Sequence, residues 1–178
     1  LLSNTTGCYN TAIGYQSLYN NCGGCHNTAI GQNALYSNTT GSYNSATGRG
    51  ALQTNTTGNY NTAIGRNSLL QNTTGSFNTS IGFTTLQNNT TGSCNIAIGE
   101  YALHSNVTGD HNFAAGQRVL NNNSSGCYNS AIGSNALRYN TTGGGNTAIG
   151  SSALNANTTG ARNIAVGAYS LNENTSGF

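Results

Sequence analysis

Charged residues are nearly absent from this chain, and proline, methionine and tryptophan are missing altogether. Only 4% of the 178 residues are charged, with a net charge of +2, whereas typical globular proteins carry roughly 25%. Five basic residues cannot form the positive surface that holds nucleic acid, so we expect no nucleic-acid partner. No apolar run approaches the roughly 18 residues of a membrane helix, and we expect no membrane insertion.

Side chains that carry catalysis are also scarce. The acids are Glu100, Asp110 and Glu173, and their separation leaves no carboxylate pair for acid–base chemistry. Asp110 precedes His111, a pair that we interpret as a surface feature. No phosphate loop, zinc-ligand pattern or nucleophile motif is present. We therefore expect a protein that is not an enzyme and holds neither a metal nor a resident cofactor.

What the sequence does contain is a repeat of 17 residues without insertion or deletion. The consensus is L-x-x-N-T-T-G-x-x-N-T-A-I-G-x-x-A, and repeat positions are counted here from its leucine. Leu at position 1, Asn at 4, Gly at 7, Asn at 10 and Gly at 14 never change. The repeats begin at Leu1, Leu18, Leu35, Leu52, Leu69, Leu86, Leu103, Leu120, Leu137, Leu154 and Leu171.

This repeat predicts an all-β fold. Two invariant glycines per repeat would each cost a helix about 1 kcal/mol, whereas N-T-A-I-G and N-T-T-G are short, β-branched segments closed by glycine. We predict a β-solenoid, either a parallel β-helix or a β-roll, of about ten 17-residue coils. Residues 1–178 form one array, which can belong to a longer one. Leu at position 1 and Ile at position 13 are expected to form the apolar ladders, with small residues at 12 and 17.

Asparagine recurs at two repeat positions. Identical Asn side chains stacked along a solenoid can hydrogen-bond amide to amide. We predict a structural ladder at position 10, formed by Asn10, Asn27, Asn44, Asn61, Asn78, Asn95, Asn112, Asn129, Asn146 and Asn163.

At position 4, the asparagine begins an Asn-x-Ser/Thr sequon in every repeat but one. The pattern fits N-glycan acceptors, which would keep a nearly uncharged rod in solution. It fits equally a Ser/Thr hydroxyl ladder without sugar, since glycans every ~4.8 Å would crowd one another. The candidate acceptors are Asn4, Asn38, Asn55, Asn72, Asn89, Asn106, Asn123, Asn140, Asn157 and Asn174. The sequence thus leaves open one attached group, covalent glycans.

The exception is the second repeat, which reads N-C-G-G-C-H-N and contains the C-x-x-C-H spacing of haem attachment. Haem is disfavoured because there is no Met and the nearest other His is several coils away. Cys8 and Cys25 both occupy position 8 in consecutive coils, roughly 5 Å apart and within disulfide range. A Cys22–Cys25 bridge competes. Since the cysteines number five, at least one stays free or pairs between chains.

The repeat motif N-T-A-I-G-x-x-A-L-x-x-N-T-T-G resembles short-repeat segments of phage tail-fibre-like and bacterial surface-fibre proteins. It is also similar to the heads of trimeric autotransporter adhesins, whose shorter repeats carry a related A-I-G turn. The resemblance covers essentially the whole chain and implies a fibre built from β-rolls or β-helices. We expect an extracellular or cell-surface structural subunit that assembles end to end with itself.

Two surface features favour a binding module as the alternative. Thr at positions 5 and 6 forms rows like those on ice-binding solenoids, although alternation lets at most one row face outward. Aromatic residues recur at position 9, where they can brace the surface or stack on sugars. The alternative partners are therefore ice or glycans on another surface.

Overall fold

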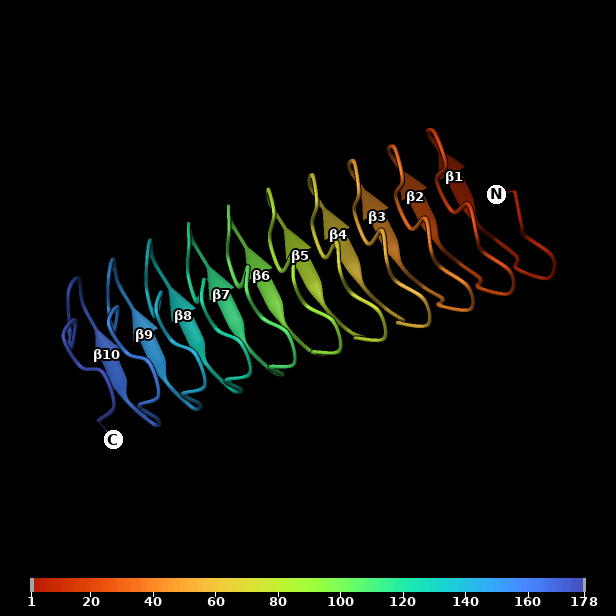
Figure 1. Ribbon diagram of the computed structural model, residues 1–178. Coiled ribbons are helices and arrows are strands. Elements are labelled where there is room, and N and C mark those ends of the chain that lie inside the picture. Colours follow the sequence, from red (N-terminus) through yellow and green to blue (C-terminus); the bar gives the residue numbers. More distant parts are fainter. Residues whose placement is uncertain (1, 178) are drawn as a thin grey trace.

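The computed structural model describes residues 2–177 and shows a straight array of stacked coils, each contributing one short strand to a single sheet (Figure 1). All ten strands are parallel, in the order β1 to β10, and each pairs only with its sequence neighbours. The fold prediction is confirmed. The strands are β1 (Thr11–Ile13), β2 (Thr28–Ile30), β3 (Ser45–Thr47), β4 (Thr62–Ile64), β5 (Thr79–Ile81), β6 (Ile96–Ile98), β7 (Phe113–Ala115), β8 (Ser130–Ile132), β9 (Thr147–Ile149) and β10 (Ile164–Val166).

The register is the repeat itself, because each strand residue pairs with the residue 17 positions away, as Ala46 does with Ala63. Side chains alternate across a strand. The middle residue of each strand, at position 12, therefore points into the coil. Positions 11 and 13 point outward, so the repeat sets which residues the sheet exposes.

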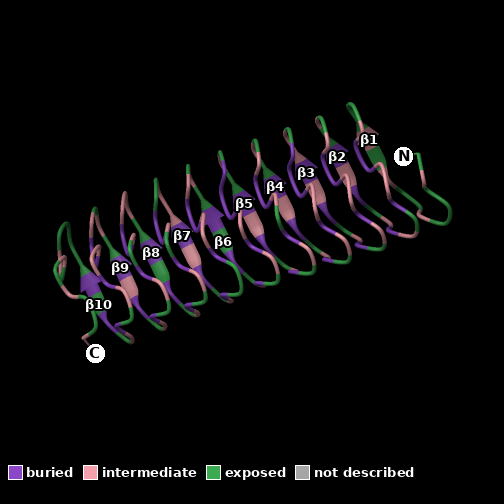
Figure 2. Cartoon of the chain, in the orientation of Figure 1, coloured by how far each residue is buried: buried purple, intermediate pink, exposed green. Residues whose placement is uncertain are grey.

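The core is a column of leucine flanked by two columns of small residues, mostly alanine. Figure 2 shows buried segments recurring from coil to coil along the rod. Leu at position 1 is fully buried from Leu18 to Leu154, while Leu1 lies outside the described residues. Small residues at positions 12 and 17, such as Ala63 and Ala51, are fully buried against it. The prediction for position 13 is wrong: Ile64 is 43% exposed, because the inward slot of its strand belongs to the preceding alanine.

The N-T-T-G segment is also not a strand, contrary to the sequence prediction, although it is bonded to the next coil. Its three successive backbone N–H groups converge on one carbonyl: Cys22 O accepts from the N–H groups of Thr5, Thr6 and Gly7 at 2.9–3.1 Å. Such convergence needs a tight bend, which an extended strand does not provide. The segment is therefore a corner of the coil.

Glycine is required at position 7 for space and at position 14 for backbone conformation. A Cβ on Gly75 would collide with Asn72 Oδ1 and the carbonyl oxygen of Gly92. Gly65 has φ +128°, a value that side chains disfavour. The core leucines are left-handed too, with φ 51° at Leu52, a strain of about 1 kcal/mol or more that burial of the side chain offsets.

Candidate functional site

The position-10 asparagines form a continuous internal ladder, as predicted. Asn78 is typical: its Nδ2 donates to Asn61 Oδ1 at 3.2 Å and to the carbonyl of Gly92 at 2.9 Å. Its Oδ1 accepts from the backbone N–H of Asn95 at 3.0 Å. The amide thus joins three coils and also satisfies a corner carbonyl. The ladder is buried from Asn27 to Asn163, and Asn10 in the first coil is half-buried.

The position-4 asparagines form a second buried ladder, which favours the alternative without sugar over their use as glycan acceptors. The Asn106 side chain is fully buried, and its Nδ2 donates to Asn89 Oδ1 at 2.7 Å and to the carbonyl of Gly109 at 2.9 Å. A sugar needs that nitrogen exposed and would displace both acceptors. The same holds for every fully buried candidate: Asn38, Asn55, Asn72, Asn89, Asn106, Asn123, Asn140 and Asn157.

The two remaining candidates lie in the end coils. Asn4 is exposed and Asn174 is half-buried. Asn4 Nδ2 still donates to the carbonyl of Gly7 at 2.9 Å, and Asn174 Nδ2 donates to Asn157 Oδ1 at 3.3 Å. Both therefore continue the position-4 ladder. Corner geometry accounts for threonine as the middle residue of the sequon, since the hydroxyl of Thr39, which follows Asn38, donates to the carbonyl of Thr56 in the next coil at 3.0 Å.

The predicted disulfide partners are in contact at the first two coils. Cys8 Sγ lies 2.8 Å from Cys25 Sγ, and the backbone N–H of Cys8 donates to Cys25 Sγ at 3.2 Å. Hydrogen bonds from the thiol and the backbone N–H of Cys8 lower the pKa of the Cys25 thiol. The same thiol–thiol hydrogen bond raises the pKa of the Cys8 thiol. Cys22 Sγ instead faces the carbonyl of Asn20 at 3.5 Å. The thiols are separate, so the bridge stays a prediction.

The N-C-G-G-C-H-N segment shows why its haem-like spacing carries no haem-site geometry. His26 is stacked between Tyr9 and Tyr43, with ring centroids 4.8 and 4.7 Å away. Both faces of its ring are therefore covered by neighbouring coils. Among residues 2–177, no group of three or more His, Cys, Asp or Glu side chains is arranged to hold a metal ion.

The aromatic residues at position 9 form a stack along one edge of the rod, which we call the position-9 ladder. Tyr43, Tyr60 and Phe77 follow His26 with centroids 4.8–5.0 Å apart and rings 4–7° from parallel. Tyr43 and Tyr60 have rings on both faces, so only their edges face the solvent. A sugar that stacks on an aromatic face has no access to these two rings, which disfavours the glycan-adhesive alternative.

The threonines at positions 5 and 6 behave differently from each other, as alternation required. Thr56 is half-buried, and its hydroxyl donates to the carbonyl of Thr73 at 3.0 Å. Thr57 is exposed. The row at position 6 therefore faces outward, whereas the hydroxyls at position 5 are engaged in hydrogen bonds between coils.

Sequence reasoning missed the outer face of the sheet. Position 13 holds an apolar residue in most coils, with exposed fractions from 36% at Ile81 to 67% at Val166. Position 11 lies beside it with Thr, Ser or Ile, and with Phe113 in one coil. We call these two columns the sheet face. Strict alternation in T-A-I, with the smaller residue inward, was the signal that could have revealed it.

The acids and histidines considered for catalysis do not converge. Asp110 Oδ1 accepts from the backbone N–H of Ser93 at 2.6 Å, so it belongs to the coil framework. Burial lowers the pKa of His104, whose ring lies beside Ser105 and Tyr101. The described chain contains no helix long and apolar enough to cross a membrane.

Comparison of the chain with known protein families, with curated proteins and with solved structures found no match. The resemblance to fibre and adhesin repeats thus remains an expectation from the sequence.

Proposed function

We propose that this chain is a structural rod, a subunit of an extracellular or cell-surface fibre. The observation that carries the proposal is the continuity of the bonds between coils. Each coil is tied to the next by a parallel strand pair, two Asn ladders and the converging N–H groups of the N-T-T-G corner. Cooperative stacking of identical units produces stiffness, which is the property that a fibre shaft needs.

The same contacts support addition of one copy to the end of another. Each corner donates N–H groups toward the coil that follows, as Thr73 and Thr74 do to the carbonyl of Thr90 at 2.9 and 3.3 Å. Strands also pair only with the coils before and after them. A following copy in the same register would repeat these bonds, because an edge strand accepts another strand.

The sheet face supports side-by-side association. Ten strands at about 4.8 Å give a stripe roughly 45 Å long. Its isoleucines are 36–73% exposed on a surface with hardly any charge. Apolar patches of that extent commonly mark protein contacts. We propose that copies pack laterally through this face while they extend along the rod axis.

The test is sedimentation velocity and negative-stain microscopy across a concentration series. The double variant Ile64→Lys and Ile98→Lys places charge on the sheet face. The control, Gln32→Lys and Gln71→Lys, adds the same charge at exposed positions outside it. We expect filaments for the native chain and the control, and thinner or no bundles for the sheet-face variant.

Dispersed monomers at high concentration for the native chain would contradict the proposal. Bundles unaffected by the Ile64 and Ile98 substitutions would contradict its lateral part alone. A thermal hysteresis measurement on the same samples checks the ice-binding alternative, which the single outward row of hydroxyls does not favour.

A further inference from the structure

The position-9 ladder has a gap of one residue near its C-terminal end. His111 stacks on Tyr128 with centroids 4.9 Å apart and rings 4° from parallel. The next coil has Gly145 at position 9, and the coil after that has Arg162. Gly145 keeps the left-handed backbone of the ladder, with φ 72° against 60° at Tyr128 and 59° at Arg162. The site for a side chain is thus built, but no side chain fills it.

The exposed fractions of the tyrosines show that one ring face is open here. Tyr43 and Tyr60 have rings on both faces and are 50% exposed, whereas Tyr128 is 67% exposed. Its uncovered face looks along the rod toward Gly145. Arg162 lies two coils away, roughly 9.6 Å by the strand spacing. That is the distance spanned by Tyr43 and Phe77, with the ring of Tyr60 between them.

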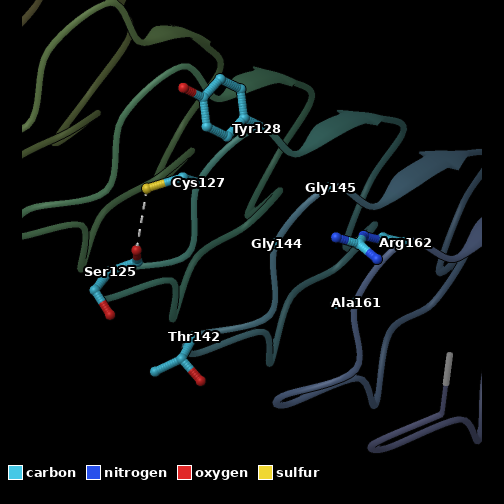
Figure 3. A pocket seen from close by; sticks show the side chains of 8 residues that line it. All are labelled: Ser125, Cys127, Tyr128, Thr142, Gly144, Gly145, Ala161 and Arg162. Carbon is cyan, nitrogen blue, oxygen red and sulfur yellow. Dashed lines mark hydrogen bonds between the residues drawn. The ribbon is translucent and has the colours of Figure 1, made fainter.

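The gap opens into a cavity of about 640 Å³. Figure 3 shows the backbone of Gly144 and Gly145 as its floor, with Tyr128 on one side and Arg162 projecting from the other. Arg162 Cγ lies 3.5 Å from where a Cβ on Gly145 would be, so the side chain of Arg162 borders the gap. Two of the backbone groups in this floor are bonded between coils: Gly145 N–H donates to Cys127 O, and Gly144 O accepts from Arg162 N–H, both at 3.0 Å.

We propose that this gap is a binding site for a flat aromatic ring that carries a carboxylate. The ring would take the place of the missing side chain and stack on the open face of Tyr128, as the ladder's own rings do. Arg162 would cover the second face and pair with the carboxylate. The proposal is independent of fibre assembly, since it needs only three adjacent coils.

The experiment is an NMR titration of the native chain with 2-naphthoate. Cyclohexanecarboxylate, which has the same charge but no aromatic face, is the control ligand. We expect saturable shifts at the amides of Gly144, Gly145 and Arg162 with 2-naphthoate and weak or no shifts with the control. Equal binding of the two ligands, or shifts spread evenly over all coils, would overturn the proposal.

Two tyrosine substitutions give a matched pair of variants. Gly145→Tyr fills the gap with the ladder's usual residue and should abolish binding. Cys94→Tyr makes the same insertion at position 9 of another coil, leaves the gap open and should bind as the native chain does. Arg162→Ala should weaken binding about 5- to 30-fold.

If Gly145→Tyr fails to fold, Tyr128→Cys is the deciding variant. It should fold, because Cys94 already occupies position 9 of another coil in this rod. Loss of 2-naphthoate binding in a folded Tyr128→Cys variant is expected. Native affinity in that variant, or in folded Gly145→Tyr, would refute the site.

Discussion

Replacing Asn123 with alanine tests the buried position-4 ladder directly. Asn123 Nδ2 donates to Asn106 Oδ1 and to the carbonyl of Gly126, both at 2.9 Å, and its Oδ1 accepts from Asn140 Nδ2 at 2.8 Å. Alanine removes all three bonds. Gly126 O still accepts from Asn112 Nδ2, and Asn140 Nδ2 still donates to Gly143 O. Asn106 Oδ1 therefore loses its side-chain donor inside the rod.

The magnitude follows from this inventory. Two bonds whose partners keep a second contact contribute about 1 kcal/mol each, and one orphaned buried acceptor costs about 1–3 kcal/mol. We expect a loss of about 3–5 kcal/mol in the free energy of unfolding. With a urea slope of about 2 kcal/mol per M for a chain of this size, the midpoint should fall by roughly 1.5–2.5 M.

The assay is urea unfolding followed by circular dichroism, with hydrogen exchange to locate the weakened coils. Asn122→Ala is the control: this neighbouring residue is exposed, and we expect a change within about 0.5 kcal/mol. Ser125→Ala removes the sequon but keeps the Asn123 amide. In protein secreted by eukaryotic cells, this variant should therefore also leave the free energy of unfolding nearly unchanged. Equal midpoints for Asn123→Ala and Asn122→Ala would refute the ladder argument.

Three further predictions concern the thiols, the core and the corner. In reduced protein, iodoacetamide should modify Cys25 at a lower pH when the chain is folded than in urea, because the folded state lowers its thiol pKa; identical pH profiles would count against this. Leu69→Ala should cost about 2–5 kcal/mol and Ile64→Ala clearly less, as thermal unfolding of the pair would show. Gly75→Ala should disrupt folding, whereas Gly23→Ala, whose added Cβ lies 3.4 Å from its nearest neighbour, should give a native circular dichroism spectrum.

The period of the leucines was sufficient to predict the architecture. An unbroken 17-residue spacing of Leu, Asn and Gly has few solutions other than stacked coils. It also placed Cys8 beside Cys25, since equal repeat positions become neighbours one strand spacing apart. The position-10 ladder followed from the same rule. These features depend only on translation along the rod, which the sequence states directly.

What the sequence left undetermined was the direction in which each side chain points within a coil. Ile64 was expected inside but is exposed, and Asn106, for which a glycan acceptor and an unmodified ladder were both left open, is fully buried. Residue chemistry favours a buried isoleucine and an exposed sequon. The coil is too narrow for that choice: leucine and alanine fill its apolar interior, and its corner carbonyls need internal donors that asparagine supplies. The 17-residue period determined which residues stack on one another. Only the closed cross-section of the coil decided which residues face the solvent.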